Sequence, residues 1–310
     1  MDCRCCVVWN THDDGLSLLC RLEHLSVKGN RLTRIDNESL TGLERLTTFD
    51  ASHNKLENLD DGALRPLTRL RRLNLADNRL RTLSSTTLPA GLEFLSVRDN
   101  LLVSVAFLAS LAHLRSVDVS GNGLVRLDGQ LFYRRVRSPL AANFSHNEIS
   151  SIDARAFADV GFSVLDLSAN RLTRLSLYGA HVVNVLRADD NHICDIDDQV
   201  FHRSRDLHLA NNRLRSLWSP CDDDTQLGSS SSPGEVPSPH ITRSGTTIQS
   251  ASSSRVLVLD VSGNQNLGPS FDSQHVGCNS LVYLSFPLFT SRFCLAPRPS
   301  SLTHSSTSTN

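Results

Sequence analysis

Asparagine recurs at the same place in ten short apolar segments, and this repetition constrains the fold more than any other feature of the sequence. The segments follow the form Leu-x-x-Leu-x-Leu-x-x-Asn, with clear copies at Leu73–Leu80 and Leu165–Leu172, and the first nine asparagines are 21 to 25 residues apart. A unit of this length cannot bury its own leucines, so such units stack into a solenoid with a shared core. These ladder asparagines are Asn30, Asn54, Asn78, Asn100, Asn122, Asn147, Asn170, Asn191, Asn212 and Asn264.

The apolar positions within each unit alternate, which predicts a short strand with one buried side. Stacked units place their strands in parallel, so we expect a parallel sheet along one face of the solenoid. The asparagine that follows each strand carries both donors and acceptors, and these can satisfy backbone groups of adjacent coils. Burial of the amides is expected only where those hydrogen bonds are made.

Bulky apolar residues in the second half of each unit supply the opposite wall. Leu59 is followed five positions later by Leu64, and Leu127 by Phe132. This pattern resembles the roughly 24-residue repeat of animal extracellular leucine-rich-repeat proteins, a group that includes Toll-type receptor ectodomains. The resemblance covers roughly residues 22–286. It implies an α/β fold: a leucine-rich-repeat horseshoe with a parallel β-sheet on the concave face and an irregular or short helical convex side.

Four of the eight cysteines cluster before the first repeat. The cluster resembles the cysteine-rich N-terminal cap of secreted repeat proteins, and its even count fits two disulfides. A zinc site with His12 is the alternative, although C-x-C-C is tighter than the gaps in structural zinc loops. The clustered residues are Cys3, Cys5, Cys6 and Cys20.

The other four cysteines fall into two groups along the chain. Cys278 and Cys294 flank the last apolar segment and would close a loop at the C-terminal end of the solenoid. Cys194 and Cys221 follow consecutive ladder asparagines. They predict either a disulfide between neighbouring coils or two independent buried thiols.

Two N-glycosylation sequons, at Asn37 and Asn143, favour the secretory pathway. The sequence begins Met-Asp-Cys-Arg-Cys-Cys without a charged and apolar leader, so as written it would stay in the cytosol. We resolve the conflict by expecting a fragment of an extracellular or cell-surface protein. No apolar run approaches the length of a membrane span, so membrane contact is expected only through missing parts of the parent chain.

Composition divides the chain into five segments. Residues 1–21 form the expected cap, and residues 22–221 carry the repeats. Asn264 follows Asn212 by 52 residues, about one repeat more than a single step, and the extra stretch at 222–254 is a Ser/Pro/Asp-rich insertion whose composition favours disorder. It is read as a tolerated insertion or as a processed loop. Final repeats and a C-terminal cap occupy 255–296, and 297–310 is a Ser/Thr-rich disordered tail.

The sequence offers no nucleophile elbow, zinc-protease motif, P-loop or dinucleotide-binding glycine motif. The acidic segment Asp189–Asp198 lacks the glycine and terminal glutamate of an EF-hand loop, so we interpret it as a solvated rim. We therefore expect a protein that is not an enzyme and has no cofactor and no bound metal. The net charge of −1 disfavours binding to nucleic acid.

Binding is the function that remains, and we expect a protein ligand or co-receptor on the concave face. Repeats three to five place an aromatic residue among arginines, the composition of an interaction hot spot. The candidate ligand-binding residues are Arg71, Arg72, Phe94, Arg98 and Arg115. A cell-surface receptor ectodomain is the favoured interpretation, a secreted matrix or adhesion protein the second and an intracellular scaffold the third. Dimerisation is left open.

The N-terminal cysteine cluster generates the first testable prediction. Because Cys3–Cys20 would cover an apolar coil end, protein made through a secretory route is expected to contain at least one disulfide there. Mass spectrometry of peptides from the non-reduced protein measures this directly. Four free thiols in folded, secreted protein would contradict the prediction.

Overall fold

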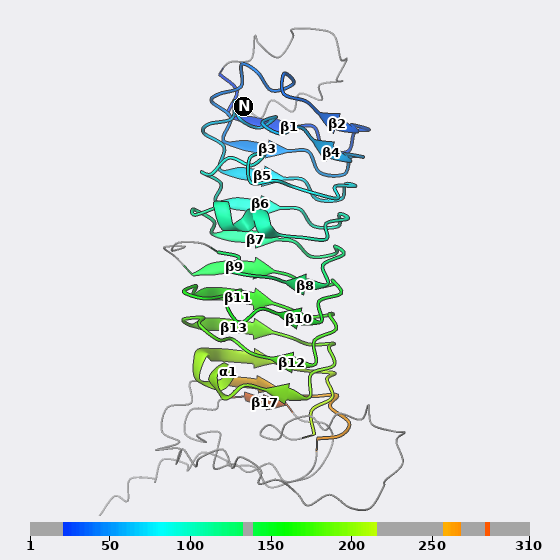
Figure 1. Ribbon diagram of the computed structural model, residues 1–310, viewed down its shortest axis with the longest axis vertical. Coiled ribbons are helices and arrows are strands. Elements are labelled where there is room, and N and C mark those ends of the chain that lie inside the picture. Colours follow the sequence, from blue (N-terminus) through cyan, green and yellow to red (C-terminus); the bar gives the residue numbers. More distant parts are fainter. Residues whose placement is uncertain (1–20, 133–138, 216–256, 268–282, 286–310) are drawn as a thin grey trace, which may run out of the picture.

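The computed structural model describes residues 21–132, 139–215, 257–267 and 283–285. Its main element is an 11-stranded sheet in which each strand pairs in parallel with the strand of the next coil (Figure 1). The strands, in spatial order, are β1 (His24–Ser26), β3 (Thr48–Asp50), β5 (Arg72–Asn74), β6 (Phe94–Ser96), β7 (Ser116–Asp118), β9 (Leu140–Asn143), β11 (Phe162–Asp166), β13 (Val183–Arg187), β15 (Ser204–His208), β16 (Val258–Asp260) and β17 (Tyr283–Ser285). The predicted solenoid with a parallel sheet is confirmed.

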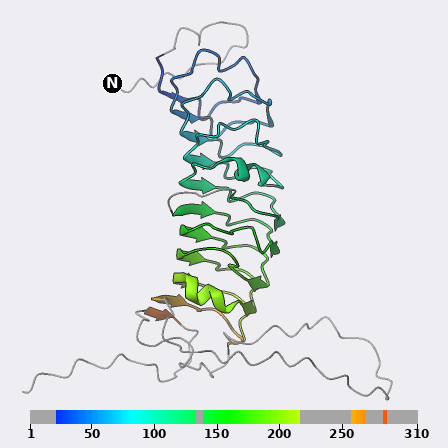
Figure 2. The same cartoon turned by 60° about the vertical axis from the view of Figure 1, so that its left-hand side comes forward.

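The three-residue strands β1, β3, β5, β6, β7 and β16 each bury the central residue and leave its two neighbours facing outward, and the longer strands β9, β11, β13 and β15 bury one residue more. Leu73 pairs in register with Phe49 on one side and Leu95 on the other, and all three are buried. Burying such side chains contributes roughly 1.5–3 kcal/mol each. A coil gains this only when a neighbour covers it, which explains why the strands stack (Figure 2).

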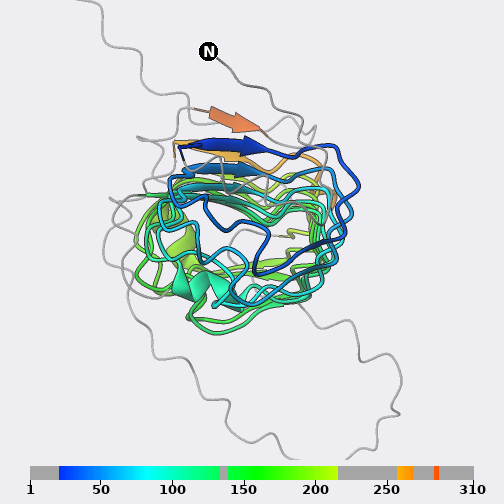
Figure 3. The same cartoon turned by 90° about the horizontal axis from the view of Figure 1, so that it is seen from above.

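The wall opposite the sheet is built from short pieces. Three two-stranded ladders lie there: β2 (Arg34–Ile35) with β4 (Asn58–Leu59), β8 (Arg126–Leu127) with β10 (Ser151–Ile152), and β12 (Arg174–Leu175) with β14 (Asp195–Ile196). A 3-10 helix, η2 (Ala106–Ser110), and one α-helix, α1 (Asp198–Arg203), complete the described part. Viewed along its axis, the solenoid has the large sheet on one side of the core and these pieces on the other (Figure 3).

Four phenylalanines pack against one another in the core at the middle of the solenoid. Phe162 lies edge-on to Phe157 and Phe132, with ring centroids 5.4 and 6.1 Å away, and Phe144 lies 6.1 Å from Phe157. Such pairs contribute about 0.5–1.5 kcal/mol beyond their burial. They join the strand side of the core to the opposite wall.

The ladder asparagines link each coil to its predecessor. Asn170 donates from Nδ2 to the carbonyl oxygens of Leu167 and Ser168 in its own coil and of Phe144 in the preceding coil, at 3.0, 3.2 and 3.0 Å. Its Oδ1 accepts from the amide of Ile149 in that preceding coil at 3.0 Å. The same pattern holds at the other ladder positions from Asn54 to Asn264.

The first member of the ladder differs. Asn30 is exposed and donates to Val27 and Lys28 of its own coil. Its difference from Asn170 follows from its place at the N-terminal edge of the described sheet.

The long gap before the last ladder asparagine leaves the stacking intact. β15 pairs directly with β16, and Asn264 accepts from the amide of Leu214 and donates to the carbonyl of Leu209, as its counterparts do at shorter separations. The stacking therefore continues in register from β15 to β16 across the long gap in sequence. The insertion limits, 222–254, and both terminal segments lie outside the described residues and stay predictions.

The asparagine ladder generates a stability prediction. Asn170→Leu leaves an amide and carbonyls unpaired inside the solenoid, and we expect a loss on the order of 3 kcal/mol, since each unpaired buried group costs about 1–3 kcal/mol. Asn30→Leu is the matched control and is expected to cost less than about 1 kcal/mol, because Asn30 is exposed and its hydrogen bonds within the described residues stay in its own coil. Urea unfolding followed by circular dichroism measures both. Equal losses would contradict the account.

Candidate functional site

The outward face of the large sheet, here called the sheet face, carries two columns of side chains. One column precedes the buried strand residue and the other follows it, so strand register places equivalent residues side by side. Adjacent strands lie about 4.8 Å apart, and the face extends roughly 50 Å along the solenoid. Stacking holds it rigid, which gives a partner a preformed surface.

The second column is dominated by aspartate and asparagine, and most of these side chains serve the turns that follow them. Asp50 and Asp118 each accept from the backbone amide two residues later at 3.0 Å, and Asp166 does so at 2.9 Å. Asn74, Asn143 and Asp260 make the same contact. The acidic bias of this face therefore has a structural cause, which the Asp-x-Ser pattern could have indicated.

Register brings two of the predicted ligand-binding residues together. Arg72 of β5 and Phe94 of β6 are paired neighbours, and the guanidinium carbon of Arg72 lies 3.9 Å from the Phe94 ring centroid. A cation over an exposed ring contributes about 0.5–1 kcal/mol. The stacking holds the arginine in place before any partner arrives.

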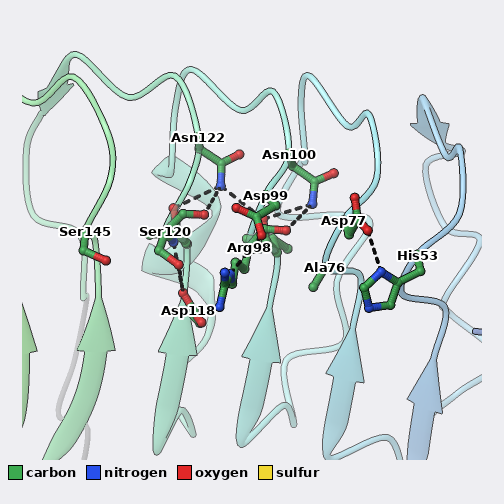
Figure 4. A network of polar contacts seen from close by, with 12 residues as sticks. His53, Ala76, Asp77, Arg98, Asp99, Asn100, Asp118, Ser120, Asn122 and Ser145 are labelled. Carbon is green, nitrogen blue, oxygen red and sulfur yellow. Dashed lines mark hydrogen bonds and ion pairs between the residues drawn. The ribbon is translucent and has the colours of Figure 1, made fainter. Parts of the chain in front are cut away.

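The other three predicted residues lie on the two edges of the sheet face. Arg71 and Arg115 come just before their strands and both approach Glu93, at 3.8 and 3.0 Å. Arg98 follows β6 at the opposite edge, where its Nε lies 2.9 Å from Asp99 (Figure 4). Glu93 is a member of this surface that the sequence analysis did not include.

The turn edge beside Arg98 repeats an unusual backbone conformation. The residue before most ladder asparagines has a positive φ, for example 54° at Asp77 and 50° at Asp99. Their side chains reach along the edge: His53 contacts Asp77 of the next coil (Figure 4), and Asp99 lies close to the backbone of Gly121. A Cβ at Gly121 would lie 2.1 Å from Asp99 Oδ1, so glycine is required while Asp99 holds this position.

A short apolar stripe occupies the first column further along. Val164 of β11 pairs with Ala141 of β9 and Val185 of β13, and all three are half-buried. The neighbouring second column carries Asp166 and Arg187. The sequence analysis did not identify this stripe, although the alternation of the strands was enough to place it.

The two sequons lie in different places. Asn37 is exposed near β2, and the hydroxyl of its sequon residue Ser39 donates to Asp36 at 2.6 Å. This hydrogen bond is the main reason that the pKa of Asp36 is lowered; burial opposes it, and hydrogen bonds from the Glu38 and Ser39 amides add to it. Asn143 stands on the sheet face with its oxygen accepting from Ser145, which leaves its amide nitrogen, the glycan attachment atom, outside that bond.

The acidic segment is distributed among separate partners. Asp195 approaches Arg174 at 3.3 Å, and Asp197 caps α1 by accepting from Gln199 at 3.1 Å. Within the described part of the chain no group of three acidic, histidine or cysteine side chains is arranged to hold a metal ion.

Asp189 is half-buried at the start of this segment. Burial raises the pKa of its carboxyl, and the hydrogen bond that it accepts from the Ala210 amide at 2.7 Å opposes that effect. Asp260 and Asp190 raise this pKa further, whereas His208 lowers it.

Cys194 is the one cysteine within the described residues, and it is disulfide-bonded. Its Sγ also lies 3.6 Å from the carbonyl oxygen of Thr173 in the preceding coil. The other seven cysteines lie outside the described residues, so a pairing with Cys221 stays a prediction, as do the two caps.

Known proteins support the architecture. A leucine-rich-repeat family model matches residues 20–80. The functional domain of InlJ from Listeria monocytogenes is similar, with a TM-score of 0.53 and 19% identity over 90% of this chain and 61% of that one. A chain of the LRIM1/APL1C complex gives a TM-score of 0.52 and 22% identity over 62% of this chain and 35% of that one.

These similarities establish the fold class. The chain is a leucine-rich-repeat solenoid, and it spans less than two thirds of the length of either similar structure. Comparison with curated protein sequences gives no match. Within the described ranges no helix has the length and apolarity of a membrane span.

Asp189 generates a pH prediction. The pKa of Asp189 is higher in the folded protein than in the unfolded chain, so the protonated carboxyl favours the folded state. This contribution to stability is present at low pH and is lost as pH rises through the folded pKa. Asp189→Asn keeps the oxygen that accepts from Ala210 but cannot ionise. Relative to the wild type, its stability is therefore expected to rise as pH increases above about 4, the ordinary aspartate value. Urea midpoints across pH measure this, and a pH-independent difference would contradict it.

Proposed function

We propose that this chain is a non-enzymatic recognition domain that binds a protein partner on the sheet face around Arg72 and Phe94. One observation carries the proposal: an exposed arginine is already stacked on an aromatic ring, on a rigid sheet with neighbouring charged groups at both edges. Arginine and aromatic side chains are the residue types that most often dominate interface energies. Little side-chain entropy is lost on binding when such residues are held beforehand.

The edges of the sheet face define the chemistry of the partner. Arg71 and Arg115 share Glu93, so three charged groups supply one excess positive charge at that edge. Arg98 is matched by Asp99 at the other edge. A protein with an apolar contact for Phe94 and a carboxylate near Arg115 fits this arrangement.

We further propose that the parent protein is a cell-surface receptor and that this chain forms part of its ectodomain. The cysteine cluster before the first repeat and the sequons at Asn37 and Asn143 support an extracellular location. A glycan on Asn143 would stand on the sheet face and direct a protein partner to one side of it. The Arg72 and Phe94 pair lies on the N-terminal side, within the footprint of a standard interface.

The test uses a partner captured from a displayed library of secreted and cell-surface proteins, with affinity measured by surface plasmon resonance. Phe94→Ala and Arg98→Ala are each expected to weaken binding by on the order of 2 kcal/mol, about 30-fold. Asp260→Asn is the control, because it keeps the turn contact to Ser262 and lies at the far end of the face.

A different set of sensitive residues would place the binding site elsewhere on the sheet face. If binding survives changes at Phe94 and Arg98 but fails with Arg187→Ala or His208→Ala, the partner occupies the C-terminal side of the sheet face. Preserved circular dichroism of each variant excludes unfolding as the cause.

A further inference from the structure

An exposed apolar patch interrupts the side of the solenoid that follows the asparagine turns. Leu101, Val103 and Val125 are 46%, 67% and 50% exposed, and with Gly123 they form what is here called the flank patch. Clustered exposed apolar side chains mark interaction sites more often than scattered ones do. The patch lies outside the sheet face and has no part in the proposed function above.

The rest of this column shows that the patch is unusual within the chain itself. The positions one and three residues after a ladder asparagine are polar or charged in the neighbouring coils. Arg79 and Arg81 occupy them in the preceding coil, and Glu148 and Ser150 in the following one. The solenoid therefore does not need apolar residues at these positions for stacking.

The flank patch extends over two adjacent coils and includes a groove. A Cβ added at Gly123 would lie 3.8 Å from Val103 Cγ1, and the Gly123 amide donates to the Leu102 carbonyl at 2.9 Å, so the two coils are in contact. Val103 and Val125 line a groove of about 280 Å³ whose floor includes Val105 and Leu131. This volume is below the usual range for small-molecule sites, about 300–1,000 Å³, and suits one or two apolar side chains of a protein.

Charges around the patch indicate the partner. Lys55, Arg79 and Arg81 lie on its N-terminal side, and Glu57 approaches Arg79 only at 3.9 Å. Across the described part of the chain, Lys55 and Arg81 form no ion pair. Glu148 on the C-terminal side is matched by Arg171 at 3.2 Å. Asp99 is matched by Arg98, and Arg126 and Asp128, which line the groove, pair with each other at 3.0 Å. Lys55 and Arg81 therefore leave the N-terminal border of the patch with excess positive charge even when Asp77 is counted as unpaired.

We propose that the flank patch is a docking site for a protein segment that carries an aliphatic or aromatic anchor between acidic residues. The anchor enters the groove between Val103 and Val125, and the carboxylates face Arg79 and Arg81. A second copy of this chain fits poorly: a parallel two-fold contact brings two basic borders together, and an antiparallel one places the basic border against the Glu148–Arg171 pair, which offers no excess negative charge.

The probes are three short synthetic peptides applied to the full chain, with binding measured by fluorescence anisotropy. One peptide has a central Leu-Phe-Leu between glutamates, the second has it between lysines, and the third has serines between glutamates. The first is expected to bind at least about tenfold tighter than the other two. Tighter binding of the lysine peptide or equal binding of the serine peptide would overturn the proposal.

The variants replace residues of the flank patch by those at the equivalent positions of the next coil. Val103→Ser with Val125→Ser copies Ser150 of the next coil and is expected to weaken binding of the first peptide at least about tenfold without changing the net charge. Gly123→Glu copies Glu148, has room for its Cβ and is expected to abolish binding. Unchanged thermal unfolding shows that both variants fold.

Val185→Ser on the sheet face is the matched control and is expected to leave peptide binding unchanged. If Val185→Ser weakens binding and the flank variants do not, the peptide binds the sheet face and the proposal is wrong. It is also wrong if sedimentation shows self-association of the wild type that Val103→Ser with Val125→Ser abolishes.

Discussion

The hydrogen bonds of the ladder asparagines are the interaction on which the rest of the structure depends. Each strand is too short to be stable alone, and its buried leucine is covered only when the next coil is in place. The asparagine carboxamide satisfies carbonyls of its own coil and of the preceding one and accepts an amide from the latter, as at Asn170. Because the same bonds recur along the solenoid, the strands keep one register. That register alone determines which exposed residues become neighbours.

The fold could be predicted from the sequence because both of its causes are local and repeated. The leucine alternation specifies a strand with one buried side, and the asparagine specifies the turn after it. Asn264 is an extreme case, since it forms the same hydrogen bonds although the preceding ladder residue is 52 positions away.

The candidate site was predicted less completely. Arg72 and Phe94 each lie six residues before a ladder asparagine, so the repeat predicts that they are neighbours on adjacent strands. In the structure they are paired, and the Arg72 guanidinium stacks on the Phe94 ring. The same counting places Arg71 before its strand and Arg98 after its own, so these two lie at opposite edges and not in one cluster. Glu93 was missed because its role depends on the rotamers of Arg71 and Arg115. The left-handed turn residues were missed because histidine, aspartate, asparagine and alanine all occupy that position.

The central claim is that the sheet face around Phe94 contacts the partner. A photo-crosslinking scan tests it most directly, with benzoylphenylalanine placed singly at Phe94, Val185 and Tyr178 of the full chain in the presence of the captured partner. Tyr178 is 59% exposed and lies away from the large sheet, after β12. The account predicts a covalent adduct from the Phe94 position, identified by mass spectrometry, and none from the Tyr178 position. Adducts from Tyr178 without any from Phe94 would contradict it.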